Sequence, residues 1–123
     1  QGTIGAVWPM LPGQRGPTSD PALRRHIMAV YLMAQLSIHD RERYAQYEAG
    51  FMAVLNEHGG TLTAVDDAAE VLEGEWPFTR SVIVRFEDRD AAKAWYESDA
   101  YQRILQHRHA ASVGNIVLVR GIG

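Results

Sequence analysis

The sequence predicts an α+β fold in which four antiparallel strands form one sheet and two helical segments cover one of its faces. Three observations lead to this prediction. Apolar residues alternate in short stretches, they recur at spacings of three and four in longer ones, and the stretches follow the order βαββαβ. A chain of 123 residues has room for one such domain with a single core. We expect this domain to occupy residues 28–123.

The first predicted strand alternates in hydrophobicity from Val30 to Ile38. Both of its faces are largely apolar near its start, so the second face is expected to meet another subunit rather than water. A helix should follow, because Asp40 is a suitable N-cap and Gly59 suits the left-handed end of a helix. Its inward stripe is predicted to consist of Tyr44, Tyr47, Phe51, Val54, Leu55 and His58.

Two more strands are predicted over residues 61–65 and 80–86, and residues 70–73 are expected to continue the edge of the sheet between them. In the later of these strands, alternate residues should face opposite sides of the sheet.

The second helical segment is predicted to start at Asp88, an N-cap, and to restart after a kink at Ser98. A turn is expected at Gly114-Asn115, before a last strand over residues 116–119. This order of elements, with both helices on one face of an antiparallel sheet, is that of a ferredoxin-like domain.

Residues 1–27 differ from the rest in composition, because four glycines alternate with four prolines there: Gly2, Gly5, Gly13, Gly16, Pro9, Pro12, Pro17 and Pro21. Such spacing interrupts helices and strands alike. We therefore predict a Gly/Pro-rich N-terminal arm.

Composition excludes several classes of function. The formal net charge is −3, so the chain offers no general basic field and nucleic acid is not an expected partner. Cysteine is absent, which excludes disulfides and thiolate chemistry. No apolar run reaches the roughly 20 residues that a membrane-spanning helix needs, and the start of the chain lacks a signal-peptide pattern. A cytoplasmic location without membrane contact is expected.

No metal or organic cofactor is predicted. Of the five histidines, His107 and His109 are two residues apart, which does not suit a helical metal pair, and the others fall on separate elements. The Gly59-Gly60 pair is too short for a phosphate-binding loop and follows a helix instead of opening one.

Several short segments carry a resemblance to a known family: residues 31–34, 58–60, 71–77, 94–98 and 117–119. From about residue 28 to 121, the chain resembles a family of small bacterial proteins, the domain of unknown function 1330, within the dimeric α+β barrel superfamily. The resemblance implies that two ferredoxin-like sheets pack face to face, and hence a homodimer through the sheet face. It implies no particular reaction. The chain departs from the family pattern after Ser98, where Asp99-Ala100 replaces Pro-Glu.

The stretch from Val71 to Phe86 combines a large aromatic residue, acids and arginines beside an apolar strand, a mixture that often lines small-molecule pockets. We select five candidate ligand-binding residues here and on the helices: Trp76, Arg80, Trp95, Tyr101 and Arg108. Core packing and ordinary ion pairs are the alternatives for these side chains. An arginine suits a carboxylate and the aromatic residues suit a ring, so the expected ligand is a small acidic or aromatic molecule.

Two functions remain open at this point. The first is a homodimer that binds a small organic molecule in a cleft between the helices and the sheet. The alternative is a cofactor-independent enzyme, similar to the monooxygenases and isomerases of the superfamily that the chain resembles. Its catalytic candidates are possible proton carriers: Tyr47, His58 and Glu73.

Overall fold

The computed structural model describes residues 28–122, and the predicted arm over residues 1–27 lies outside them. The described chain forms β1 (Val30–Ile38), α3 (Arg41–Glu57), β2 (Thr61–Asp66), β3 (Arg80–Phe86), α4 (Arg89–Glu97), α5 (Asp99–Ala111) and β4 (Ser112–Arg120).

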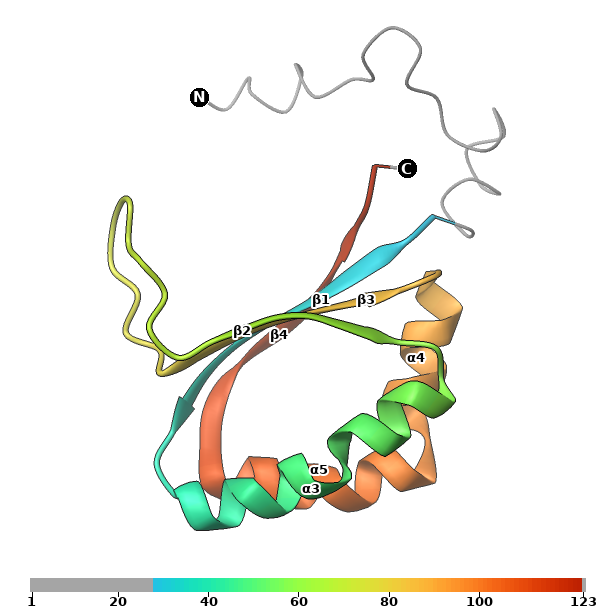
Figure 1. The fold of residues 1–123 in the computed structure, drawn as a ribbon, viewed down its shortest axis with the longest axis horizontal. Coiled ribbons are helices and arrows are strands. Elements are labelled where there is room, and N and C mark those ends of the chain that lie inside the picture. Colours follow the sequence, from blue (N-terminus) through green and yellow to red (C-terminus); the bar gives the residue numbers. More distant parts are fainter. Residues whose placement is uncertain (1–27, 123) are drawn as a thin grey trace, which may run out of the picture.

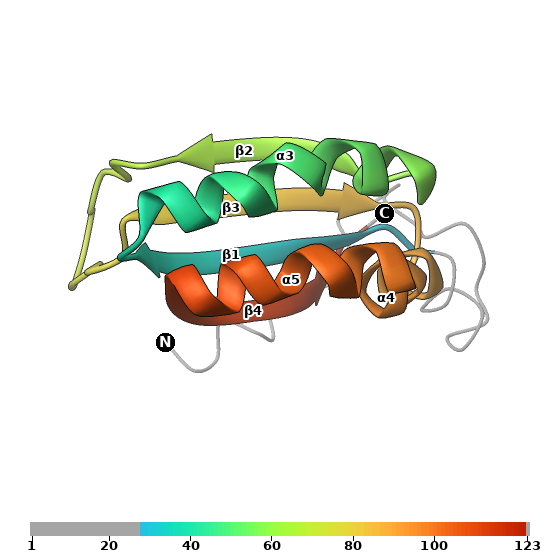
Figure 2. The ribbon, with the colours of Figure 1, turned by 90° about the horizontal axis from the view of Figure 1, so that it is seen from below.

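The four strands form one antiparallel sheet in the order β2-β3-β1-β4. Strand β1 lies at its centre and pairs with β3 on one side and β4 on the other, while β2 and β4 are the edges (Figure 2). All three described helices cover the same face (Figure 1). The predicted ferredoxin-like fold is therefore confirmed, with the second helical segment divided into α4 and α5.

Capping residues explain where the helices begin and end. The Asp40 carboxylate accepts a hydrogen bond of 3.0 Å from the backbone N–H of Arg43 at the start of α3. Just beyond the other end, Gly59 has φ of 74°, a conformation that glycine adopts without steric cost. Ser98 separates α4 from α5, because its hydroxyl accepts a bond of 3.1 Å from the N–H of Tyr101 and thereby caps α5. The predicted kink is thus a complete break between two helices.

Two local predictions are wrong. Residues 70–73 do not continue the edge strand and belong to the irregular loop between β2 and β3. Gly114-Asn115 is not a turn, because both residues lie within β4. Glycine is needed at position 114 because β4 passes close to β1 there. A Cβ on Gly114 would lie 2.1 Å from the backbone oxygen of Gln35 on β1.

The sheet has one covered and one uncovered face. On β1, alternate side chains are buried against the helices: Val30, Leu32, Ala34 and Leu36. The residues between them lie on the opposite side, which we call the open face. Strand register assigns several exposed apolar residues to the open face: Met33, Val113, Val117 and Val119. The core therefore lies between the helices and only one side of the sheet.

Candidate functional site

A cavity of about 200 Å³, which we call the helix-side cavity, lies between the helices and the covered face of the sheet. All four strands and all three described helices contribute to its lining. Most of the lining is aliphatic or aromatic, and the aromatic members are Tyr44, Tyr47, Phe51, Trp95 and Tyr101. The charged members are Glu48, Arg80 and Arg108. An apolar hollow with a few convergent polar groups is the usual form of a small-molecule site.

Arg108 is the most unusual member of this lining. It lies on the inward side of α5 with Tyr101 and Leu105, at spacings of three and four, and only 6% of it is exposed. Its guanidinium lies over the ring of Tyr47, 5.7 Å from the centroid. Among the described residues, its Nε has no hydrogen-bond partner and it forms no salt bridge. A buried charge without a counter-ion is costly, so this position favours an anion.

Two tyrosines beside Arg108 bond to each other. The hydroxyl oxygens of Tyr47 and Tyr101 are 2.8 Å apart in the interior. Burial raises the pKa of Tyr47 well above its ordinary value, and its contact with Tyr101 raises that pKa further. Burial also raises the pKa of Tyr101, although Arg108 partly opposes this increase. Both phenols therefore stay protonated at neutral pH, which makes them hydrogen-bond donors rather than bases.

Trp95, which lines the cavity from α4, carries a second buried donor without a partner among the described residues. The residue is 1% exposed, and its ring centroid is 4.1 Å from that of Tyr101. Its indole N–H has no hydrogen-bond partner within the part of the chain that the structure describes. Buried donors are nearly always paired, so this N–H calls for an explanation.

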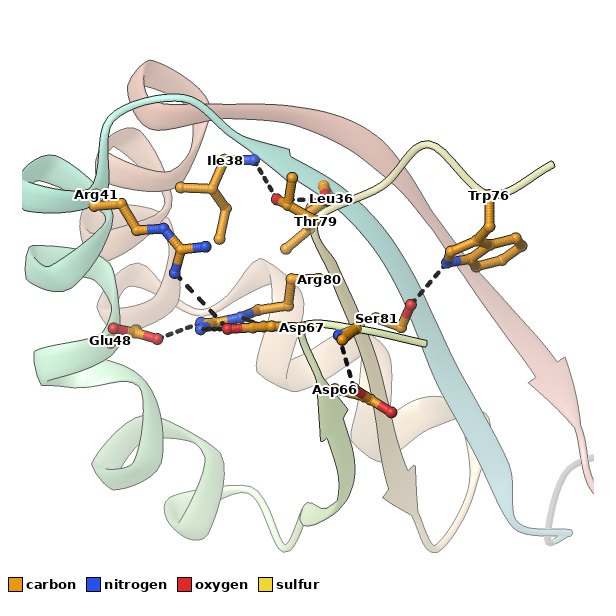
Figure 3. Close-up of polar contacts among 11 residues, drawn as sticks. Leu36, Ile38, Arg41, Glu48, Asp66, Asp67, Trp76, Thr79, Arg80 and Ser81 are labelled. Atoms are coloured by element: carbon orange, nitrogen blue, oxygen red, sulfur yellow. Dashed lines mark hydrogen bonds and ion pairs between the residues drawn. The ribbon is translucent and has the colours of Figure 1, made fainter. Parts of the chain in front are cut away.

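Arg80, at the start of β3, differs from Arg108 because it is fully neutralised (Figure 3). Its Nε and Nη2 donate to the two carboxylate oxygens of Asp67 at 2.7 and 3.0 Å, and its Nη1 donates to Glu48. Its guanidinium also lies 5.3 Å from the ring centroid of Tyr44. Hydrogen bonds from Arg80 lower the pKa of Asp67. This network ties α3 to the end of β2 and the start of β3.

The structure places the other predicted site residues away from the helix-side cavity. Trp76 and Glu73 lie on the loop between β2 and β3 and line a different hollow of about 500 Å³ over the open face, the open-face hollow. The indole N–H of Trp76 donates to the hydroxyl of Ser81 at 3.0 Å, on the other side of β3 from the Arg80 network (Figure 3). His58 caps the end of α3, where its Nδ1 is 3.0 Å from the backbone oxygen of Val54.

Five of the predicted residues are thus brought together around one cavity: Tyr47, Arg80, Trp95, Tyr101 and Arg108. Sequence reasoning missed the partners of Arg80. Glu48 follows Tyr44 by four residues on α3, a spacing that places both on one side of the helix. Asp67 lies just after β2 and is the other partner. The sequence did hold a signal for the pair of Arg80 and Asp67: an arginine stands at the first position of a strand, and the loop before that strand begins with an aspartate.

Residues 28–122 contain no group of three or more histidine, aspartate or glutamate side chains placed to hold a metal ion. None of the helices in this part of the chain combines the length and the apolarity that crossing a membrane requires.

Comparison with solved structures places the chain in a class of small α+β proteins. A protein of unknown function from Rhodopseudomonas palustris is 15% identical, with a TM-score of 0.70 over 89% of this chain and 99% of that one. SnoaB, a cofactor-independent oxygenase from Streptomyces nogalater, is 14% identical, with a TM-score of 0.53 over 76% and 93%. A dimeric ferredoxin-like protein from Jannaschia sp. CCS1 is 15% identical, with a TM-score of 0.56 over 74% and 97%. At these identities the likeness establishes the fold.

The class is therefore the ferredoxin-like α+β domain. Within it, the chain belongs to the family described as domain of unknown function (DUF1330), whose model matches residues 29–122. The sequence has no significant match among curated proteins. The resemblance predicted from the sequence is confirmed.

Proposed function

We propose that this protein is a homodimer that binds a small organic anion in the helix-side cavity. The observation that carries this proposal is Arg108, a buried guanidinium with no carboxylate partner among the described residues. Guanidinium groups remain charged at any physiological pH and bind carboxylates through two parallel hydrogen bonds. A ligand carboxylate would supply the missing counter-ion, and the aromatic and aliphatic lining would enclose the rest of the ligand.

The open face supports the proposed assembly. Its exposed apolar side chains form a patch across β1 and β4 that water contacts unfavourably, and such patches mark interaction surfaces. A dimer through this face would leave the helix-side cavity on the other side of each sheet. Each subunit would then hold its own binding site.

Ligand binding can be tested with three carboxylates of different shape: pentanoate, cyclohexanecarboxylate and benzoate. Isothermal calorimetry on the full chain should show saturable binding of at least one of them. The substitution Arg108→Met should weaken that binding by about 30-fold or more, because removing one partner of a buried charge pair costs about 2–5 kcal/mol.

The matched control is Arg103→Met, which removes a guanidinium from the exposed side of the same helix. This control should bind the same carboxylate as the unmodified chain does. Failure of all three carboxylates to bind, or equal binding by the Arg108 variant, overturns the proposal.

A second candidate function is cofactor-independent catalysis on the bound anion. It is favoured by the protonated tyrosine pair beside Arg108, since donors of this kind stabilise the oxygen of an enolate. Glu48 is the one carboxylate in the cavity lining, and it is held by Arg80. Binding without turnover is therefore the first proposal.

Proton exchange separates the two candidates. Phenylpyruvate in D₂O loses its C3 protons through the enol, and proton NMR follows the loss. A binding protein should leave this rate at the uncatalysed value. An acceleration that disappears in Arg108→Met would favour the enzyme instead.

A further inference from the structure

We propose that the ligand is a single-ring aromatic carboxylate with a second oxygen acceptor, held by Arg108 through its carboxylate and by the indole N–H of Trp95 through that second oxygen. This inference rests on the proposed function and narrows its ligand class. It depends on two residues of the cavity lining, one on α5 and one on α4, each having a buried donor without a partner in the described part of the chain.

Burying the indole N–H of Trp95 without a hydrogen bond costs folding free energy, and packing alone does not require that N–H. The side chain is fully enclosed, and its rings pack against Tyr101, Phe86 and Phe51. A phenyl ring would provide much of this packing without a buried donor, whereas an unpaired buried donor loses its bond to water and gains nothing in return. An acceptor in the cavity would remove this cost.

The protein does not supply that acceptor from the polar groups of the cavity lining. Guanidinium groups only donate hydrogen bonds, so neither arginine can accept one. The hydroxyls of Tyr47 and Tyr101 and the carboxylate of Glu48 are acceptors, but none of them pairs with the indole N–H of Trp95, which has no partner among the described residues. An oxygen on the ligand is the remaining source. Because a carboxylate held bidentately by Arg108 has both oxygens engaged, we assign this acceptor to a second oxygen of the ligand.

Shape and size favour one aromatic ring. Five aromatic side chains line the cavity, and rings of this kind prefer offset or edge-to-face contact with another ring. An apolar cavity of about 150 Å³ is enough to bind benzene. At about 200 Å³, the helix-side cavity therefore suits one ring with a carboxylate and a small substituent, rather than fused rings.

Substituted benzoates test this assignment directly. We would compare 2-, 3- and 4-hydroxybenzoate with the methylbenzoate of the same substitution, because methyl and hydroxyl groups are similar in size and only the hydroxyl accepts a hydrogen bond. At least one hydroxybenzoate should bind about fivefold or more tightly than its methyl counterpart, which is the gain expected from one buried hydrogen bond.

The substitution Trp95→Phe should bring this hydroxyl-to-methyl affinity ratio close to one. The matched control is Trp76→Phe, which removes an indole from the open-face hollow and should leave the ratio unchanged. The ratio is informative even if the Trp95 variant binds every benzoate more weakly.

A spectroscopic measurement on the unmodified chain avoids any effect on folding. The chain has three tryptophans, whose indole N–H resonances can be assigned with Trp8→Phe and Trp76→Phe. The Trp95 resonance should move downfield on addition of the preferred hydroxybenzoate and less with the matched methylbenzoate.

The outcomes distinguish this inference from the proposed function beneath it. If benzoates bind through Arg108 but no hydroxyl gains affinity, or the gain survives in Trp95→Phe, this inference is overturned and the proposed function stands. If no benzoate, pentanoate or cyclohexanecarboxylate binds, both are overturned.

Discussion

The two hollows of this domain lie on opposite faces of one sheet and differ both in volume and in whether their buried polar groups have hydrogen-bond partners. The open-face hollow is the larger, at about 500 Å³ against about 200 Å³ for the helix-side cavity. Its neutral polar side chains are paired, since Trp76 donates to Ser81 and Asn115 donates to Gln35 at 3.2 Å, and its two glutamates are exposed to water. Two residues that line the helix-side cavity instead have buried donors without partners in residues 28–122. Unsatisfied buried groups, rather than volume, therefore indicate which hollow is prepared for a ligand.

The open face is distinguished by exposed apolar side chains. Exposed apolar residues gather on β4 there, with Val113 at 66% and Val117 at 53% exposure. Because the sheet separates the two faces, assembly and ligand binding can be altered independently. The following substitutions test that separation.

The largest effect is expected for Val117→Lys at the open face. A two-fold dimer would place two such lysines in one interface, and a cost of about 3 kcal/mol corresponds to a dissociation constant about 100-fold higher. Sedimentation equilibrium measures this change. Arg103→Glu, on the exposed side of α5, should leave the dimer intact. Identical sedimentation of Val117→Lys and the unmodified chain at every concentration would exclude the open face as the interface.

Arg108→Met should stabilise the protein without ligand, although it should abolish tight binding. Replacing a buried charge that has no counter-ion among the described residues with an apolar side chain removes its desolvation penalty. We expect a gain of about 1 kcal/mol, which raises the Tm by about 4–8 °C for a domain of this size. Thermal denaturation followed by circular dichroism provides the measurement. A comparable fall in Tm would mean that Arg108 is a structural residue instead.

Tyr47→Phe should lower the free energy of unfolding by about 1 kcal/mol, because it removes the buried hydrogen bond between the hydroxyls of Tyr47 and Tyr101. Trp76→Phe removes a hydrogen bond at a partly exposed site in the open-face hollow, so its cost should stay within about 0.5 kcal/mol. Urea unfolding compares the two variants. Equal costs would contradict the contrast between the hollows.

The same tyrosine predicts a dependence on alkaline pH. Burial raises the pKa of Tyr47 above its ordinary value of 10.0, so the folded state keeps the proton longer than the unfolded state does. The resulting contribution to stability is complete below about pH 10 and is lost as pH rises through the folded pKa. Stability should therefore fall less steeply above pH 10 in Tyr47→Phe. An unchanged slope would show that this phenol does not contribute.

The smallest effect is expected for Asp67→Asn, which breaks the bidentate contact with Arg80. Asp67 is substantially exposed, so the cost at neutral pH should be no more than about 1 kcal/mol and should shrink at high salt. Because Arg80 lowers the pKa of Asp67, its contribution is present above the unfolded value of 3.8 and is lost as pH falls through the folded pKa.

Urea unfolding at about pH 3 and about pH 7 measures the Asp67 contribution. The control is Glu73→Gln, in the loop beside the open-face hollow. It should leave the free energy of unfolding close to that of the unmodified chain at both pH values and at high salt. A salt-independent loss in Asp67→Asn would indicate packing rather than charge.

The sequence by itself determined the order of elements, the helix caps and which side of each regular element faces inward. Helices and strands have constant periods, so the stripe with Tyr47 on α3 and the stripe with Tyr101 and Arg108 on α5 follow from spacing alone. The period of two also placed Arg80 on the same side of β3 as Val82.

Only the tertiary structure decided which of these side chains meet. An irregular loop has no period, so nothing local showed that Glu73 and Trp76 would lie over the open face, on the other side of the sheet from Arg80. The close approach at Gly114 and the pairing of Arg80 with Asp67 join segments that are distant in sequence or separated by that loop. The sequence also did not show that donors of Trp95 and Arg108 would lack partners among the described residues. Whether a donor lacks a partner depends on all the neighbours that packing brings near it.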